Sequence, residues 1–357
     1  MSTRPERAVG LLADAQIDVL LVTNLVNVGY LTGYSGSNGL AVIGDAARVF
    51  VTDFRYVEQA AQEVDPSFDR RRAPQELIEA VGEALPGGAI RLGFESSDVS
   101  VRDHGRLRES LPERVELVAV HGLVERLRAV KDPEEVARIR SAAQLADAAL
   151  GRLLERGLTG RTERHLALEL EYEMRALGAQ RVSFDPIVAA GPHGALPHAS
   201  PRDVDVAEGQ LVVIDWGAEL DGYCSDCTRT VATGQVGEDE AAIYQLVLDA
   251  QLTGLNAVRA GAHGQAVDGA ARAVIESAGY GDLFGHGLGH GVGLEVHEGP
   301  RLSQRSEDAL REGNVVTVEP GVYIPGAFGV RTEDLVVVGE GGCEILTSIS
   351  KELTVVD

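Results

Sequence analysis

The stretch from Val213 to Thr230, VIDWGAELDGYCSDCTRT, most constrains the fold, because it reads as two short strands joined by a tight turn. The turn is predicted at Asp221-Gly222, since Asp-Gly accepts the positive φ angles of a two-residue hairpin. Symmetric pairing about this turn sets Gly217 opposite Asp226. Asp215 then shares a sheet face with Asp226 as a diagonal neighbour, roughly 7–8 Å away at the backbone.

Two carboxylates on one sheet face repel each other unless a cation lies between them. Two metal ions separated by about 3.5–4 Å would fit such a gap, with the carboxylates bridging or chelating them. The alternative is a pair of solvated aspartates on an exposed hairpin. Both interpretations are compatible with this stretch taken alone.

Length and charge limit the class of protein. A chain of 357 residues is long for one core, so two domains are expected. The net charge of -23 opposes binding to nucleic acid or to an anionic membrane. No apolar run has membrane-spanning length, and the N-terminus lacks a signal-peptide layout, so a cytoplasmic protein is predicted. The three cysteines (Cys224, Cys227 and Cys343) are predicted to be packing residues in a reducing compartment.

The first predicted domain, residues 1–124, alternates helices, strands and loops as a small α/β domain does. A helix is expected over 4–16. The loop from Tyr30 to Gly39, YLTGYSGSNG, is rich in glycine but lacks the spacing of a dinucleotide site. Strands are expected at 17–22, 40–43, 49–52, 92–95 and 115–118.

The domain boundary is predicted near 125–132, and the second domain is predicted to span 130–357. Asp132 and Pro133 are typical of a helix start. Thr162 is expected to cap a second helix that runs to about Leu177. Further helices are predicted near 238–259 and 266–278. One apolar face of the first helix is formed by residues at helical spacing: Val136, Ile139, Ala143, Ala146, Leu150 and Leu153.

Glycines flank two histidines, His286 and His290, in the stretch GHGLGHGVG, and His297 follows closely. Glycine lets a ligand approach the backbone and leaves the imidazoles open. We therefore expect a functional role for at least one of these histidines. His193 has no comparable support and is interpreted as an ordinary loop histidine.

Two glutamates, Glu319 and Glu333, lie in otherwise apolar strands on either side of a turn predicted at Pro325–Gly329. Their separation allows them to face one another, and an apolar strand does not bury a lone charged glutamate without a partner. Arg331 is expected to pair with one carboxylate and a cation with the rest. The alternative is an Arg331–glutamate ion pair with no metal.

Together these stretches supply two aspartates, two glutamates and a histidine, an oxygen-rich set that suits two divalent ions such as manganese or cobalt. In order, spacing and local sequence the motifs closely resemble the creatinase/prolidase/methionine-aminopeptidase family of pita-bread metallopeptidases. The resemblance covers the whole chain, because YLTGYSGSNG and FVTDFRYVEQA look like the N-terminal domain of Xaa-Pro aminopeptidases and prolidases. It implies a small creatinase-like α/β domain followed by a pita-bread catalytic domain of mixed α/β and α+β class.

The resemblance also implies a role for each site residue. Two metal ions, Mn²⁺ first with Co²⁺ or Zn²⁺ as alternatives, would be bound by Asp215, Asp226, His290, Glu319 and Glu333. His198 would lie near the substrate carbonyl, and His297 would contact the peptide in the transition state. A metal-activated hydroxide would attack the carbonyl, and Glu319 would pass a proton to the leaving nitrogen. Supporting positions would be His286, Tyr323 and Arg331.

The activity implied is hydrolysis of the peptide bond before proline. The N-terminal stretches favour an aminopeptidase that acts on peptides with proline at the second position. A dipeptidase that accepts Xaa-Pro alone is the alternative, although the sequence does not reveal the cation that it would need for the substrate carboxylate. A non-catalytic pita-bread binding module and a metal-free amidinohydrolase are less favoured, because both would be expected to lack metal ligands. The resemblance also implies a homodimer.

Overall fold

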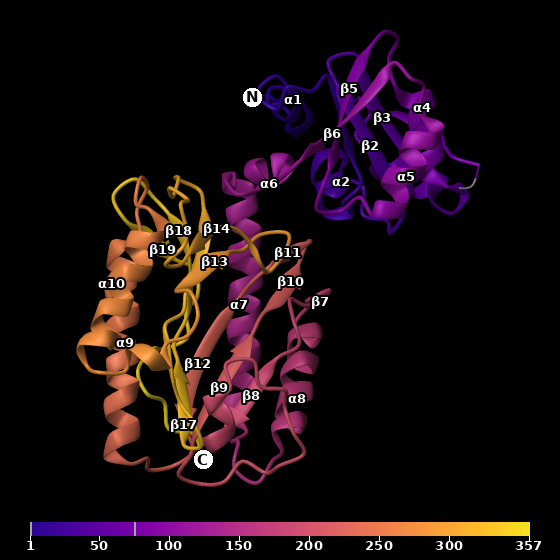
Figure 1. The fold of residues 1–357 in the computed structure, drawn as a ribbon. Coiled ribbons are helices and arrows are strands. Elements are labelled where there is room, and N and C mark those ends of the chain that lie inside the picture. The colour runs from indigo at the N-terminus through magenta and orange to yellow at the C-terminus, as the bar shows by residue number, and fades with distance from the viewer. Residues whose placement is uncertain (1, 75) are drawn as a thin grey trace. The chain divides into compact units, whose positions relative to one another are not determined.

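The computed structural model describes residues 2–74 and 76–357. The chain divides into two compact units, one ending at Arg128 and the other running from Ala129 to Asp357. Both units mix helices and strands (Figure 1). This confirms the predicted fold class.

The N-terminal unit is built on one six-stranded sheet in the order β4-β3-β2-β1-β5-β6. Strands β1, β5 and β6 run parallel, whereas β2 pairs antiparallel with both β1 and β3. Apolar side chains from the sheet and its covering helices form the core. The elements are α1 (Arg4–Val9), β1 (Val19–Val22), α2 (Leu25–Thr32), β2 (Leu40–Gly44), β3 (Ala47–Thr52), η1 (Phe54–Tyr56), α3 (Val57–Glu63), β4 (Asp69–Arg72), η2 (Leu77–Ala80), α4 (Val81–Ala84), β5 (Ile90–Glu95), α5 (Val101–Ser110), β6 (Val115–Val120) and α6 (Leu123–Arg128).

The first helix is shorter than predicted. The expected helix over 4–16 ends at Val9, and Gly10 is its C-cap. Glycine inside a helix costs about 1 kcal/mol relative to alanine, so the chain continues in turns. The strand expected from Ile17 begins at Val19.

The C-terminal unit contains two sets of strands, each covered by its own pair of long helices. Figure 1 shows α9 and α10 to the left of the strands and α8 to the right. The elements are α7 (Pro133–Glu155), α8 (Glu163–Ala176), β7 (Arg181–Val182), β8 (Ile187–Ala190), η3 (Gly191–Ala195), β9 (Leu211–Trp216), β10 (Ala218–Leu220), β11 (Tyr223–Cys224), β12 (Cys227–Ala232), α9 (Glu238–Ala257), α10 (Gly264–Ser277), η4 (Gly281–Leu283), β13 (Gly289–Gly291), β14 (Glu298–Leu302), β15 (Val315–Val318), β16 (Gly321–Ile324), β17 (Phe328–Arg331), β18 (Asp334–Val338) and β19 (Cys343–Ile345).

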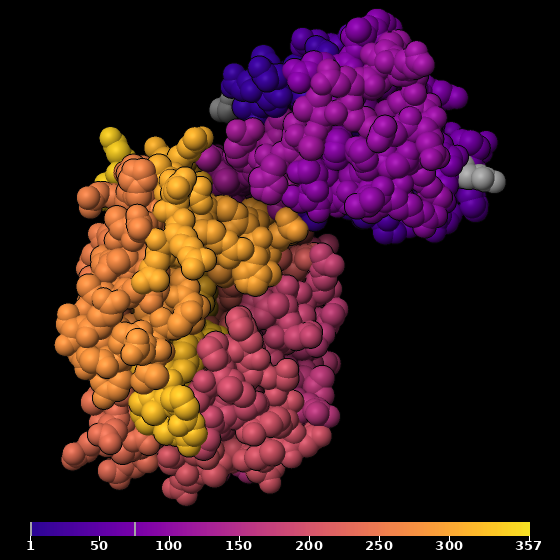
Figure 2. Space-filling model, in the orientation of Figure 1, coloured from indigo at the N-terminus to yellow at the C-terminus, as the bar shows by residue number. Residues whose placement is uncertain are grey.

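Each set of strands forms an apolar core with its own pair of helices. One joins α7 and α8 to β8, β9 and β12, and includes the fully buried Trp216. The other joins α9 and α10 to β15, β16, β17 and β18. In Figure 2 the orange and yellow residues of the second half meet the red residues of the first along the visible face. The strands that carry the acidic residues therefore lie between two packed layers.

The two predicted helix starts in this unit are confirmed. Asp132 accepts hydrogen bonds from the amides of Glu134 and Glu135, and Glu135 bonds back to the amide of Asp132, which forms a capping box. Thr162 caps α8 through the amide of His165. The predicted apolar face of α7 is buried, apart from the partly buried Val136.

The cysteines form no disulfide. Cys224 and Cys227 are buried, and Cys343 is partly buried. Burial raises the pKa of the Cys224 thiol to about 12, which leaves it protonated and unreactive near neutral pH. The interpretation of these residues as packing groups is confirmed. No helix of the described residues has the length and apolar character needed to cross a bilayer.

Candidate metal centre

The first acidic pair lies on the predicted hairpin. Asp221 and Gly222 have φ angles of 50° and 77°, as a two-residue turn with positive φ requires. The pairs Glu219–Cys224 and Trp216–Cys227 on the two sides share one register. That register sets Gly217 opposite Asp226, as predicted from the sequence. Asp215 pairs with Thr228 and lies on the same face as Asp226.

The second acidic pair also lies in one register. Val318 pairs with Asp334 in β15–β18, and Gly321 pairs with Arg331 in β16–β17. Glu319 and Glu333 lie between these pairs and therefore face each other, as predicted. The turn is shorter than expected, because Phe328 and Gly329 already belong to β17, which leaves the three residues 325–327 in the loop.

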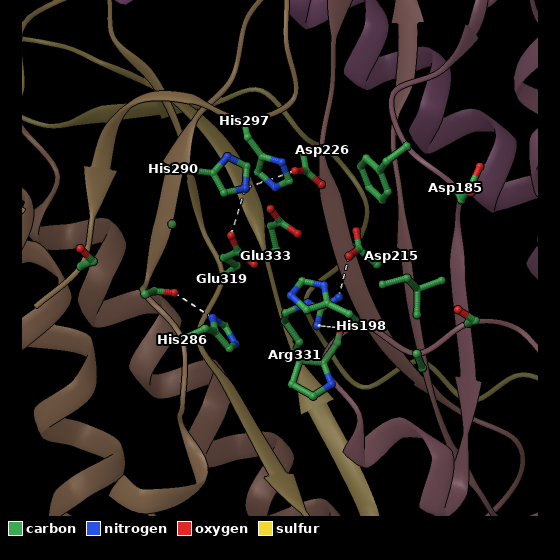
Figure 3. Close-up of a pocket in the computed structure, with 18 of the residues that line it drawn as sticks. Asp185, His198, Asp215, Asp226, His286, His290, His297, Glu319, Arg331 and Glu333 are labelled. Atoms are coloured by element: carbon green, nitrogen blue, oxygen red, sulfur yellow. Dashed lines mark hydrogen bonds and ion pairs between the residues drawn. The ribbon is translucent and has the colours of Figure 1, made fainter. Parts of the chain in front are cut away.

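The two acidic pairs and His290 converge in one pocket of about 520 Å³ (Figure 3). Carboxylate oxygens of Asp215, Asp226 and Glu333 all lie within 4.8 Å of one another. The Nε2 atom of His290 lies 3.6 Å from Oδ2 of Asp226 and 3.3 Å from Oε1 of Glu319. Five side chains from distant parts of the chain thus meet around one small volume.

The hydrogen bonding and burial of His290 leave its Nε2 atom facing the acidic cluster. Its Nδ1 atom lies 3.1 Å from the carbonyl oxygen of Gly291, an acceptor, so Nδ1 carries the hydrogen. Burial lowers the pKa of His290 to about 3, so the ring is neutral. Its Nε2 lone pair therefore faces the oxygens of Asp226 and Glu319, an arrangement that a shared cation would make favourable.

The acidic groups lead to the same conclusion. Oδ1 of Asp215 and Oε1 of Glu333 are buried without a hydrogen-bond partner. Burial and the neighbouring carboxylates raise the pKa of Asp226 and of Glu333 well above their usual values. Burial raises the pKa of Glu319 to about 7. Carboxylate oxygens that are buried without a hydrogen-bond partner, in groups whose ionised form is disfavoured, are suited to bind a divalent cation. Carboxylates together with one imidazole are a suitable ligand set for such cations.

Arg331 pairs with an aspartate of the cluster and not with a glutamate. Its Nη2 atom donates to Oδ2 of Asp215 at 2.6 Å, and its Nη1 atom donates to the hydroxyl of Tyr323 at 2.9 Å. Its Nε atom donates to Thr228 Oγ1, which donates in turn to Oε2 of Glu333 at 2.7 Å. The direct Arg331–glutamate ion pair of the metal-free alternative is therefore not found. Sequence reasoning did not find Thr228, although it lies opposite Asp215 in the hairpin.

His286 stands behind the cluster. Its Nδ1 atom donates to the carbonyl of Gly287, so its Nε2 atom accepts from the Tyr323 hydroxyl at 3.0 Å. Burial lowers the pKa of His286 to about 4. A neutral His286 therefore orients Tyr323, which contacts Arg331, so these three side chains support Asp215 as a chain of hydrogen bonds.

His198 and His297 are exposed at the rim of the same pocket. The ring of His297 packs edge-on against that of His290, with centroids 4.4 Å apart. Burial, with Arg301 nearby, lowers the pKa of His297. Both rim histidines can reach a ligand that lies over the acidic cluster.

Comparison with known proteins fits this geometry. The sequence model of metallopeptidase family M24 matches residues 137–340, and that of the Creatinase/Prolidase N-terminal domain matches residues 4–130. The chain belongs to metallopeptidase family M24. The predicted pairing of a creatinase-like N-terminal domain with a pita-bread domain is confirmed. Membership of M24 makes the chain a hydrolase and implies divalent metal ions.

Several relatives match over nearly the whole M24 chain. The Xaa-Pro dipeptidase from Pyrococcus furiosus is 37% identical over 356 residues, covering 99% of this chain and 100% of the relative. The structure of Xaa-Pro dipeptidase from Bacillus anthracis superimposes with a TM-score of 0.95 at 39% identity, covering 99% of both chains. That of X-Pro aminopeptidase from Thermotoga maritima MSB8 superimposes with a TM-score of 0.90 at 37% identity, covering 99% of this chain and 100% of the other.

Arg301 is a residue of the M24 pocket that the sequence did not reveal. It pairs directly with His290 across β13 and β14, so both side chains lie on one face of the sheet. It is exposed, lines the pocket, and its guanidinium has no hydrogen bond or ion pair with the described residues. The register of β13 and β14 shifts between His290 and Gly291, and only the structure shows this shift.

Proposed function

We propose that this M24 peptidase is a Xaa-Pro dipeptidase that hydrolyses the bond between an N-terminal residue and a C-terminal proline. The aminopeptidase activity favoured from the N-terminal sequence becomes the second candidate. The observation that carries the proposal is the position of Arg301, an unpaired cation on the face that also carries His290. A dipeptide presents its carboxylate within one residue of the scissile bond, and a guanidinium binds a carboxylate through two parallel hydrogen bonds.

The relatives support this choice. Two full-length matches to this chain, from Pyrococcus furiosus and Bacillus anthracis, bear the name Xaa-Pro dipeptidase. The Thermotoga maritima relative, named X-Pro aminopeptidase, is the observation that keeps the second candidate in place. The pocket volume of about 520 Å³ lies within the range of sites that enclose a small ligand.

Five side chains are proposed to hold two divalent ions, with Mn²⁺ as the first choice and Co²⁺ or Zn²⁺ as alternatives. Asp226 and Glu333 would hold the ions from the most deeply buried positions of the set. Bound divalent ions lower the pKa of water enough to supply a nucleophile near neutral pH. The proposed set is Asp215, Asp226, His290, Glu319 and Glu333.

The remaining groups act on the substrate. Water adds to the scissile carbonyl carbon, the bond from that carbon to the proline nitrogen breaks, and Glu319 carries the proton of the water to that nitrogen. A positioned carboxylate can act as general base and then general acid in such a step. His198 and His297 donate hydrogen bonds where negative charge develops on the carbonyl oxygen. Phe184 and Ile187 provide an apolar wall of the pocket, which suits a proline ring.

The test compares Xaa-Pro, Xaa-Pro-Yaa and Xaa-Ala substrates with protein reconstituted in Mn²⁺. We expect turnover of Xaa-Pro, at least tenfold weaker turnover of the tripeptide, and close to none of Xaa-Ala. Preference for the tripeptide would establish the aminopeptidase, and turnover of none would exclude both. Elemental analysis supplies a separate check, because fewer than one metal ion per chain in active protein would contradict the dinuclear site. The expected homodimer is tested by sedimentation.

A further inference from the structure

The loop between β8 and the segment 202–206 carries His198, and a single buried carboxylate holds both of its ends. Oε1 of Glu163 accepts hydrogen bonds from the amide of Ala190 at 3.0 Å and from Nη2 of Arg202 at 3.1 Å. Oε2 accepts from Nδ1 of His193 at 2.9 Å. It also accepts from the amide and Nε of Arg202, at 3.0 and 3.1 Å. Five donors converge on one side chain.

Glu163 is itself held rigidly. It is the first residue of α8, next to the capping Thr162. Its amide donates to the carbonyl of Val204, and the amide of Arg164 donates to the carbonyl of Arg202. The start of the helix and the end of the loop are therefore joined by backbone as well as by side-chain hydrogen bonds.

The environment of Glu163 is that of an ionised, fully satisfied group. Its side chain is 1% exposed. Burial by itself raises the pKa of Glu163, but the hydrogen bonds from Arg202 and from the Ala190 amide outweigh burial and hold that pKa below its usual value. A buried carboxylate with this many donors resists displacement, because losing any one donor leaves charge uncompensated.

The part of the loop between the two anchored ends also contacts β17, on both sides of Leu196. His198 is exposed, and the carbonyl of the preceding Pro197 accepts from Nη1 of Arg331 at 3.0 Å. Upstream, the backbone of Gly194 lies so close to Gly329 of β17 that a side chain on Gly329 would clash with it. A hydrogen-bond donor in a catalytic site must be held within roughly 0.5 Å to contribute fully.

We propose that Glu163 is a positioning residue that holds the 190–202 loop so that His198 reaches the substrate carbonyl. The inference rests on the proposed function, because His198 contributes only if the chain hydrolyses a peptide bond. His193, interpreted from the sequence as an ordinary loop histidine, becomes one arm of this anchor. Neither Glu163 nor His193 touches the metal-ligand set.

The first test measures the loop without using activity. Hydrogen exchange followed by mass spectrometry is compared for the wild type, Glu163→Gln and Glu173→Gln. Glu173 is a matched control, because it lies on the same helix, is 4% exposed and pairs with Arg152 and Arg156, away from the loop. We expect exchange in the segment 188–204 to rise at least about tenfold in Glu163→Gln and to stay unchanged there in Glu173→Gln.

The second test is kinetic, on Mn²⁺-reconstituted protein. His198 acts on charge that develops in the transition state, so Glu163→Gln should lower kcat about tenfold and leave KM within about twofold. His198→Ala should lower kcat about 100-fold, and the double variant should be no slower than His198→Ala alone. Metal content should equal that of the wild type.

Arg202→Met tests the same anchor if the Glu163→Gln variant fails to fold. The Arg202 side chain is 47% exposed, so its replacement should be tolerated. It removes two of the five donors and should show the same kinetic pattern more weakly. Unchanged loop exchange, or losses in kcat that multiply in the double variant, would overturn the positioning role. A wild type that cleaves no Xaa-Pro substrate would overturn the proposed function instead, and the exchange result would still report on the anchor.

Discussion

Nη2 of Arg331 lies 2.6 Å from Oδ2 of Asp215, while the other oxygen of that carboxylate is buried without a partner. The Arg331 guanidinium thus neutralises Oδ2 of Asp215, and Oδ1 faces the acidic cluster. Arg331 reaches Glu333 as well, through the hydroxyl of Thr228. The arginine therefore holds one carboxylate of each acidic pair, and the unpaired oxygens of both lie in the same cluster.

Replacing Arg331 with methionine should destabilise the protein by about 3–5 kcal/mol, because it leaves a buried carboxylate without its cation. The loss should be smaller with Mn²⁺ than with EDTA, since a bound cation also neutralises Asp215. Urea unfolding in both conditions measures this. Arg71→Met is the control, because Arg71 pairs with Asp69 at the same kind of distance but both side chains are exposed. That change should cost less than about 1 kcal/mol.

Arg301→Met should weaken the use of Xaa-Pro dipeptides by about 2 kcal/mol, or roughly 30-fold in kcat/KM, mostly through KM. A substrate with an amidated C-terminus should be hydrolysed equally by wild type and variant, since it has no carboxylate to bind. Arg305→Met is the control, because Arg305 lines the neighbouring groove and not this pocket. Equal losses with the free acid and the amide would argue against a carboxylate contact.

His297→Ala should lower kcat by about 10²–10³-fold, the usual loss when a donor to developing oxyanion charge is removed. Metal content should be unchanged, because His297 lies beside His290 and outside the proposed ligand set. His165→Ala, on the exposed face of α8, should behave as wild type. A His297 variant with normal kcat, or one that loses its metal, would contradict the rim position assigned to it.

The metal-free protein should lose stability as pH rises from 6.5 to 8, above the range in which the lowered pKa values of His286 and His290 make stability rise with pH. Folding raises the pKa of Glu319 to about 7, so the folded state holds a proton there that the unfolded chain releases near pH 4.5. The stabilisation is present below pH 4.5 and is lost as pH rises through about 7, and Asp226 and Glu333 shift in the same direction.

Urea unfolding in EDTA at pH 6.5, 7, 7.5 and 8 measures this slope. Glu319→Gln should flatten it, because the amide does not titrate, and saturating Mn²⁺ should reverse the loss. A free energy of unfolding that rises over this pH range in EDTA would contradict the raised pKa values of the buried carboxyl groups.

The sequence determined the parts of this protein that depend on local chemistry. The Asp221-Gly222 turn sets the register that brings Asp215 and Asp226 onto one face, because a two-residue turn leaves a single way to pair its strands. A short turn likewise set Glu319 opposite Glu333. Helix starts at Asp132 and Thr162 were predictable for the same reason, since capping involves only neighbouring residues.

Only the tertiary structure decided which of these elements meet. Arg331 contacts Asp215, more than a hundred residues away, because the two acidic hairpins pack against each other. Arg301 lies beside His290 because the register of β13 and β14 shifts. Glu163 contacts the loop that carries His198 because α8 packs beside that loop. Such contacts depend on how apolar faces are buried together, and no short stretch of sequence encodes that geometry.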